Sequence, residues 1–476
     1  MENVPPEVLL HIFDFLDGPA PSQVRLRDQP RSDMLDVKPP LFSHLKTISF
    51  VCRAWRTLSM SSLFRHILWR PKISSLRAFT MNPIPLLRFL EDNRLDRGVT
   101  TFTMVVDFVD KEADARHITP VIRSVDLEWL WDQLFSVIDP LRFTIIAPPT
   151  TLAAFMSRML FLDDAWSFSI PYHILSLART KRGPSRGKSS EYTEAHLSDL
   201  QLSPPEHDTR RASQPTAAGL STRLRDRKPP ACPLFTVRPW TSILLNEGSS
   251  TRVYRTYEFF LRRPPSMLGA LLGCEEHPND TPLIPSSVED FNYIAIFPLS
   301  SHFEILVHHL PKLRRLFVQL TPGPEDRLLE DEDEVKYIDL ADLWMERNTA
   351  YSSLVRELTF AGAGLEAQQP GNWPALQVFE SGDAADKEAW EMAVEFVRRS
   401  GVRAWRVERE GVFVKHDDEG NRPDTEREID GHIAVADAAG SPIFQRSLRR
   451  FAFNGIAHLP FSSMWLYTHH DQAPIM

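Results

Sequence analysis

The chain has 476 residues, too many for one small hydrophobic core and enough for two or three packed units. Hydrophobic residues make up 42% and charged residues 25%, the ordinary balance of a globular protein, so most of the chain can bury a core. The formal net charge of -9 excludes a global electrostatic attraction to nucleic acid or to an anionic membrane.

The three cysteines, Cys52, Cys232 and Cys274, are far apart and odd in number. This pattern indicates neither a disulfide framework nor a zinc site, and it fits a reducing compartment. The N-terminus lacks the basic start and apolar run of a signal peptide, and no stretch approaches the ~18 apolar residues of a membrane span. We therefore expect a cytoplasmic or nuclear protein that has neither nucleic acid nor membrane as a partner.

The N-terminal segment 4–17 is predicted to be a helix. Pro5 and Pro6 fall in its first turn, where a missing N–H group costs nothing. One apolar stripe at i, i+3, i+4, i+7 spacing is formed by Leu9, Ile12, Phe13 and Leu16. Leu10 and Phe15 lie off this stripe, so the helix is apolar on more than one side and must pack on its own domain and on something else.

A polar loop and two more helices are predicted next. The loop, 18–44, is rich in Pro, Asp, Arg and Ser. A second helix is expected from about Phe42 to Leu58, and a third, short helix over 61–69. The apolar face of the second helix is formed by Leu45, Ile48, Cys52 and Trp55, widened by Val51. Three short helices with surplus apolar surface need a partner or the neighbouring domain.

These residues resemble an F-box. Pro-Pro-Glu-Val-Leu-Leu at 5–10 and Val-Cys-Arg-Ala-Trp at 51–55 stand in the order of the two halves of that motif, which opens with Leu-Pro-x-Glu and continues with Val-Cys-x-x-Trp. Val4 stands where Leu is usual, and the loop 18–44 separates the halves. The resemblance covers about residues 4–69, and the insertion leaves open whether the adaptor surface is accessible.

The resemblance implies a function that involves partner proteins. F-box proteins bind a Skp adaptor, which bridges to a cullin, while a second domain holds the substrate of the ubiquitin ligase. The chain would then be a substrate-recognition subunit and not an enzyme, and it would contribute proximity. Carried over by motif position, the residues expected to bind the adaptor or to hold its surface are Pro5, Pro6, Leu9, Leu10, Ile12, Phe13, Leu16, Val51, Cys52 and Trp55.

The segment 71–180 is predicted to be the first part of an α/β domain. Alternation and β-forming residues indicate strands, and apolar positions at helical spacing indicate helices. The expected strands are 101–109 and 141–146, and the expected helices are 125–138 and 151–160.

The next segment, 181–233, is dominated by Pro, Ser, Gly, Arg and Lys. It cannot bury enough apolar surface to offset its ordering entropy, so we expect it to be disordered. Arg210-Arg211-Ala212-Ser213 resembles a site read by basophilic kinases, which makes Ser213 a possible phosphorylation site.

The segment 234–476 is predicted to be the second part of the α/β domain. The expected elements are a strand or helix end at 313–320, strands at 355–360, 376–380, 402–407 and 412–415, and a helix at 384–399. The order strand, helix, strand over 376–407 favours a parallel α/β unit.

The fold class expected is α+β: a three-helix F-box followed by an irregular leucine-rich-repeat-like α/β domain, interrupted by a disordered insert. Spacings of about 20 to 40 residues between the strands are less regular than a true array, so an ordinary open α/β sheet is the alternative. The layout is similar to that of fungal F-box proteins.

No cofactor or metal is expected, because the histidine pairs at 308–309 and 469–470 share no ligand spacing with other residues. The acidic run 330–334 is interpreted as a solvated loop, with recruitment of a basic substrate as the alternative. There is no phosphate loop and no nucleophile elbow, so an enzyme is the least favoured reading. The competing hypothesis is a non-catalytic interaction or structural protein whose F-box-like helices only cap the α/β domain.

Overall fold

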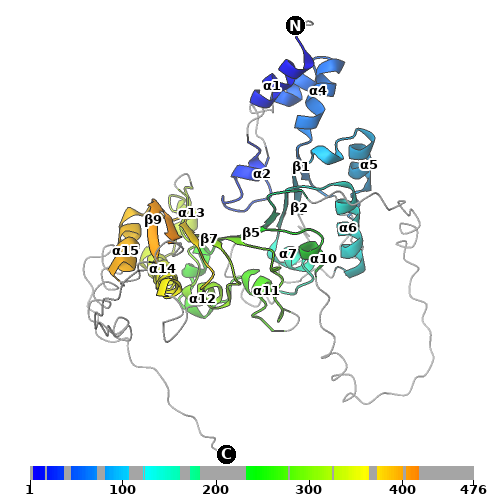
Figure 1. The fold of residues 1–476 in the computed structure, drawn as a ribbon. Coiled ribbons are helices and arrows are strands. Elements are labelled where there is room, and N and C mark those ends of the chain that lie inside the picture. Colours follow the sequence, from blue (N-terminus) through cyan, green and yellow to red (C-terminus); the bar gives the residue numbers. More distant parts are fainter. Residues whose placement is uncertain are drawn as a thin grey trace, which may run out of the picture.

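The structure is a computed structural model, and it describes residues 4–16, 19–36, 44–71, 81–106, 122, 124–160, 172–182, 232–276, 279–323, 326–363, 373–399 and 404–416. Over these described residues the chain is a mixed α/β protein, as expected, with a ten-stranded and mostly parallel sheet (Figure 1). In Figure 1 a helical unit near the N-terminus projects from one end of this sheet.

The strands are β1 His66–Trp69, β2 Thr101–Val105, β3 Arg142–Ala147, β4 His173–Ala178, β5 Ser242–Ser249, β6 Asp290–Ile296, β7 Arg315–Gln319, β8 Val378–Ser381, β9 Trp405–Arg409 and β10 Val412–Lys415. From β1 to β8 each strand pairs with the next strand in sequence, and β10 and then β9 complete the sheet. Neighbours are parallel except that β4 is antiparallel to β3 and β5, and β10 is antiparallel to β8 and β9.

One face of the sheet, the helix face, packs against helices. These are α5 Ile84–Asp92, α6 Ser124–Val137, α7 Pro149–Phe155, α10 Pro233–Thr236, α11 Leu268–Leu272, α12 Ser300–His309, α14 Leu340–Ala363 and α15 Lys387–Arg399. Each helix contributes buried apolar side chains to one continuous cluster with the inward residues of the strands, such as Phe102, Phe143 and Phe291. This burial is the main source of stability of the fold.

The opposite face carries a smaller buried cluster, and we call it the insert face. It includes Val105, Ile146 and Leu244 from the strands, together with residues of the short 3-10 helices η5 Thr251–Arg255 and η6 Phe259–Leu261. The remaining short elements are η1 Asp96–Gly98, α13 Glu332–Val335 and α2 Pro21–Val24. Within the described ranges, no helix has the length and apolar character that crossing a bilayer requires.

The N-terminal helices differ in two ways from the expectation. The single helix over 42–58 is two helices, α3 His44–Ser49 and α4 Arg53–Leu63, while α1 spans Pro6–Leu16. The break lies at Cys52, whose backbone is extended and whose side chain caps α4. The third helix over 61–69 is wrong: α4 ends at Leu63, and His66–Trp69 is strand β1, because it pairs in register with Thr101–Met104.

Most strands predicted in the α/β region are confirmed, with one clear error. The strand expected at 355–360 lies inside the long helix α14, which packs Leu354 and Leu358 against the main cluster. The helix expected over 151–160 ends earlier, at Phe155. The expected parallel unit over 376–407 is modified, because β10 lies between β8 and β9 and runs antiparallel to both. Gly411, with φ of 79°, provides the tight turn of this hairpin.

The segment expected to be disordered, 181–233, lies outside the described residues except at its ends, and so does Ser213. At its beginning, Arg182 donates a hydrogen bond to the carbonyl oxygen of Val99 at 2.9 Å. At its end, Cys232 precedes α10 and is buried beside Phe155, whose carbonyl oxygen lies 3.7 Å from the thiol sulfur.

Candidate functional site

The helical unit formed by α1, α3 and α4 has a small core of its own. Leu9, Phe13 and Leu45 are buried there and form a cluster separate from the two clusters of the sheet. Phe13 and Trp55 pack edge to face, with ring centroids 5.7 Å apart. Because this core is small, it offers only modest stability by itself.

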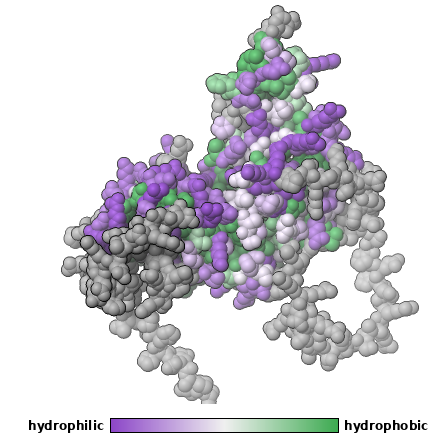
Figure 2. Space-filling model, in the orientation of Figure 1, coloured by the Kyte–Doolittle hydropathy of each residue, from purple (hydrophilic) through white to green (hydrophobic). Residues whose placement is uncertain are grey.

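The same unit exposes several large apolar side chains, which we call the apolar patch residues. They are Val8, Ile12, Phe15 and Leu16 of α1, and Phe50 and Val51 between α3 and α4. Phe15 is 90% exposed and Phe50 69%, although phenylalanine is normally a buried residue. In Figure 2 hydrophobic residues gather visibly on this unit. Exposed apolar surface of this kind is typical of protein-interaction sites.

The ten residues carried over from the F-box motif fall into three groups by exposure. Leu9 and Phe13 are buried and hold the unit together, and Leu10 and Trp55 are half-buried. The exposed candidates, which are available to a partner, are Pro5, Pro6, Ile12, Leu16, Val51 and Cys52.

Sequence reasoning missed three exposed residues of this surface, Val8, Phe15 and Phe50. Phe15 had a visible signal, because it lies off the apolar stripe of α1. Val8 and Phe50 had none, since their exposure depends on how α1 and α3 pack together. Cys52 is exposed, and its sulfur accepts a hydrogen bond from the backbone N–H of Trp55 at 3.5 Å, so it serves as a helix cap.

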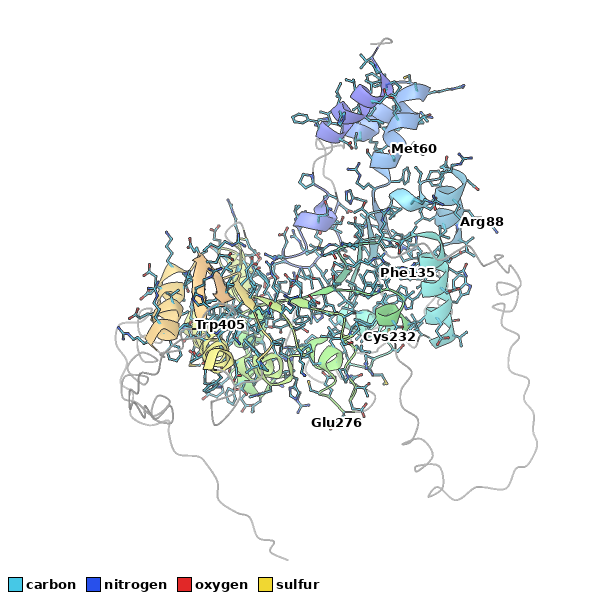
Figure 3. All side chains as sticks on the ribbon, in the orientation of Figure 1. Met60, Arg88, Phe135, Cys232, Glu276 and Trp405 are labelled. Carbon is cyan, nitrogen blue, oxygen red and sulfur yellow. The ribbon has the colours of Figure 1, made fainter. Side chains whose placement is uncertain are left out.

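The helical unit is joined to the sheet through the end of α4. Phe64 packs against Phe89 of α5, with ring centroids 5.2 Å apart. Met60, labelled on α4 in Figure 3, packs against the main cluster of the sheet. Arg65 pairs with Asp14 of α1 at 2.9 Å and ties α1 to the same junction. The unit therefore stands on the edge of the sheet and does not cover either of its faces.

The insertion between the motif halves takes a path that the sequence does not reveal. Its described part, residues 19–36, which we call the insert, lies on the insert face of the sheet and leaves the apolar patch residues exposed. Leu26, Met34 and Leu35 are buried there with the strand residues of the second cluster. Arg70, just after β1, fastens the end of the insert by donating to Ser32 O and to Asp36.

Polar side chains of the sheet also bind the insert. The amide of Asn246 on β5 donates to the carbonyl oxygens of Leu26 at 3.0 Å and of Asp28 at 2.8 Å. The hydroxyl groups of Ser22 and Thr101 are 3.2 Å apart. These contacts fix the backbone of the insert across the central strands.

Arg27 of the insert lies flat on the sheet. Its guanidinium carbon is 3.6 Å from the centroid of the Phe317 ring, and its Nη2 donates to Asn292 at 3.3 Å. Burial lowers the pKa of Arg27, while the negative charges of Glu380 and Asp290 oppose this effect. The guanidinium group is thus held by an aromatic face and by Asn292, with its outer side in solvent.

A cavity of about 1240 Å³ lies beside the insert. Its insert side carries Arg25, Arg27 and Arg31. Its lining also includes four acidic residues of the segment 326–334, together with two further arginines; these are Asp326, Glu330, Asp331, Glu334, Arg252 and Arg327. The acidic run thus has structural contacts as well as exposed charge: Glu334 pairs with Arg252 at 2.7 Å, and Asp331 caps α13.

A buried polar cluster lies on the helix face. Glu247 of β5 accepts hydrogen bonds from Tyr293 at 2.8 Å and from the backbone N–H of Met267 at 2.7 Å, and its carboxylate is 3.1 Å from His302. Burial raises the pKa of Glu247, but the hydrogen bond and charge of His302 and the neighbouring His173 outweigh it and lower this pKa to about 2. The side chains of Glu247, Tyr293 and His302 are all buried, so the cluster is a structural anchor of α11.

Other candidates are placed without forming a site. His308 and His309 end α12, and among the described residues no group of three His, Cys, Asp or Glu side chains is arranged to hold a metal ion. No family model matches the chain, and no curated protein or solved structure matches it either.

Proposed function

We propose that the chain is a substrate-recognition subunit of a ubiquitin ligase of the Skp–cullin–F-box type. The helical unit would bind the Skp adaptor through the apolar patch residues, and the α/β region would bind a protein substrate. One observation carries the proposal: a small helical unit with the motif order of an F-box exposes Ile12, Phe15 and Val51, although it has a separate core. Apolar and aromatic anchors are the residues that dominate protein interfaces.

The path of the insert supports this proposal. The described residues of the insertion lie on the sheet, away from the exposed side chains of α1. These residues of the insertion therefore leave exposed the surface that we propose for the adaptor. For the α/β region we propose an irregular leucine-rich-repeat-like solenoid, because β1 to β8 are neighbours in their order along the chain.

The test is co-purification of the full chain with a Skp-type protein. We expect the wild-type chain to bind, and the double variant Phe15→Asp with Val51→Asp to lose binding at least ~100-fold, because two charges would enter an apolar interface. Tyr257→Asp is the matched control, since Tyr257 is 94% exposed on the α/β region, and it should bind as wild type does. Absence of binding by the wild-type chain would refute the proposal.

The competing hypothesis, in which the helices only cap the α/β domain, predicts a different result. Phe15→Asp and Val51→Asp would then leave the binding of every partner unchanged, and loss of the helices would unfold the sheet. Deletion of residues 1–70 cannot separate the hypotheses, because it removes β1 and the insert together. Point substitutions at exposed positions avoid this problem.

A further inference from the structure

We propose that the insert face is a recognition site for a turn-forming, arginine-bearing segment of a protein substrate, and that residues 26–28 of the insert occupy it as a built-in competitor. The inference rests on the proposed function for the identity of the partner as a ligase substrate. The binding site itself is argued from the contacts between the insert and the sheet.

The site binds a turn of the backbone first: in residues 25–28 the N–H of Asp28 donates to the carbonyl oxygen of Arg25 at 3.1 Å. Asn246 is almost fully buried, and its Nδ2 donates to the carbonyl oxygens of two residues that flank Arg27. Its Oδ1 accepts from the N–H of Gly248 at 3.0 Å, which fixes the orientation of the amide. Contacts to a peptide backbone do not depend on the side chains of the peptide, so another segment that adopts the same turn can make them as well.

The site then selects side chains. Leu26 enters the apolar cluster of the insert face, where the strand residues Val105, Ile146 and Leu244 are buried. Arg27 stacks on Phe317 and donates to Asn292. The charges of Glu380 and Asp290 favour its cationic form, and Glu380 also pairs with Arg315. An aromatic face together with carboxylates favours a guanidinium group over an ammonium group. Leu-Arg is therefore the core of the expected ligand.

The adjacent cavity flanks this core. Asp326, Glu330 and Asp331 line it together with Arg252 and Arg327, and arginines 25 and 31 reach it from the insert. Arg252 pairs with Glu334 and Arg327 with Glu330, so these opposite charges offset one another. The ligand class is thus a turn-forming segment with a Leu-Arg core.

The competitor is a part of the same chain, so it has a high effective concentration and masks the site. A partner must displace it, and any change that weakens the insert should increase the affinity for the partner. The probe is a labelled peptide of residues 22–36, and its binding to the full chain is measured by fluorescence anisotropy. The control peptide carries Leu26→Ser and Arg27→Ala.

Three variants of the full chain sharpen the test. The first, Leu26→Ser with Arg27→Ala, weakens the insert and should bind the peptide at least ~10-fold more tightly than wild type. The second adds Asn246→Ala and should lose this gain. The matched control, Gln23→Ala with Val24→Ser, changes exposed residues of the same insert and should bind as wild type does.

Two results would overturn the proposal. One is that the weakened variant, with circular dichroism and melting like those of wild type, binds neither peptide or both equally. The other is that, at saturating peptide, hydrogen exchange of residues 22–36 in the wild-type chain stays unchanged, since the insert would then be a fixed structural plug. Skp binding is measured on the same variants: its absence throughout would refute the proposed function and leave the peptide result intact.

Discussion

The side chain of Asn246 donates a hydrogen bond to the carbonyl oxygen of Leu26, at 3.0 Å and across 220 positions of the sequence. Both residues are buried. The side-chain amide of Asn246 also donates to the carbonyl oxygen of Asp28 and accepts from the N–H of Gly248. A loop that separates two halves of a short motif is thereby bound to the middle of a sheet. The first prediction follows from this bond.

Asn246→Asp should release the insert from the sheet. A carboxylate has no donor, and its oxygens would face the carbonyl oxygens of Leu26 and Asp28, at a cost of roughly 2 kcal/mol or more. We expect limited trypsin digestion to cleave within the insert, after Arg25, Arg27 or Arg31, at least ~10-fold faster than in wild type. Cleavage elsewhere in the same chain is the internal control. Unchanged cleavage would mean that Asn246 does not hold the insert.

Phe13 and Phe15 should behave in opposite ways, although they are two positions apart. Phe13 is 2% exposed and packs on Trp55, so Phe13→Ala should destabilise the helical unit by about 3–4 kcal/mol. Phe15 is 90% exposed, so Phe15→Ala should change stability by less than about 0.5 kcal/mol. Urea titration monitored by far-ultraviolet circular dichroism would measure both. Equal losses would contradict the burial described for α1.

Acid should weaken the fold through His173. The imidazole is fully buried, and no hydrogen-bond partner of either ring nitrogen lies in the described part of the chain. Burial lowers the pKa of His173 from 6.5 to about 4, against the attraction of Glu247. Between these two pH values the unfolded chain binds the proton and the folded chain does not. The free energy of unfolding should therefore fall as the pH falls from 6.5 to 4, by about 3 kcal/mol.

The measurement is the free energy of unfolding of wild type and of His173→Leu between pH 7 and pH 4. The variant lacks the group that titrates, so its stability should fall less over this range. Below pH 4.5 both chains should lose further stability, because the pKa of Glu247 is lowered to about 2 in the folded state. Parallel curves for the two chains down to pH 4 would show that His173 is not the source.

Asp383 should be essential for the junction of β7 and the segment before α15. Its buried carboxylate accepts hydrogen bonds from the backbone N–H of Leu320 at 3.0 Å and of Thr321 at 2.8 Å. Asp383→Asn puts an NH2 group in place of one accepting oxygen, and we expect a loss of about 2 kcal/mol in a denaturant titration. Asp339→Asn is the control: its exposed Oδ1 accepts from Ala341, and the amide oxygen retains that role.

Strands β2, β3 and β7 and helix α15 were predictable from the sequence, because their apolar residues have one clear period. The helical state of residues 355–360 was not predictable. The apolar residues Val355, Leu358 and Phe360 fit a helix as well as they fit an apolar strand. Tertiary packing of Leu354 and Leu358 decides for α14. For β1, the hydrogen bonds to a strand 35 residues later override the local preference for a helix.

The candidate site was predictable only in part. The motif order located the helical unit, but the division into buried Leu9 and exposed Ile12 required the packing of three helices. The place of the insert had no signal, because its partners, such as Asn246 and Phe317, lie more than 200 residues away. A polar, proline-containing segment is read as a free loop unless its distant contacts are known.

The passage from α4 to β1 has a mechanical consequence. Only two residues, Phe64 and Arg65, separate Leu63 at the end of the helix from His66 in the strand, and β1 is paired with β2 throughout. Such a short, packed connection has no swivel. The helical unit and the sheet are therefore held at a set distance and angle, so the chain would act as a rigid spacer between the two partners that we propose.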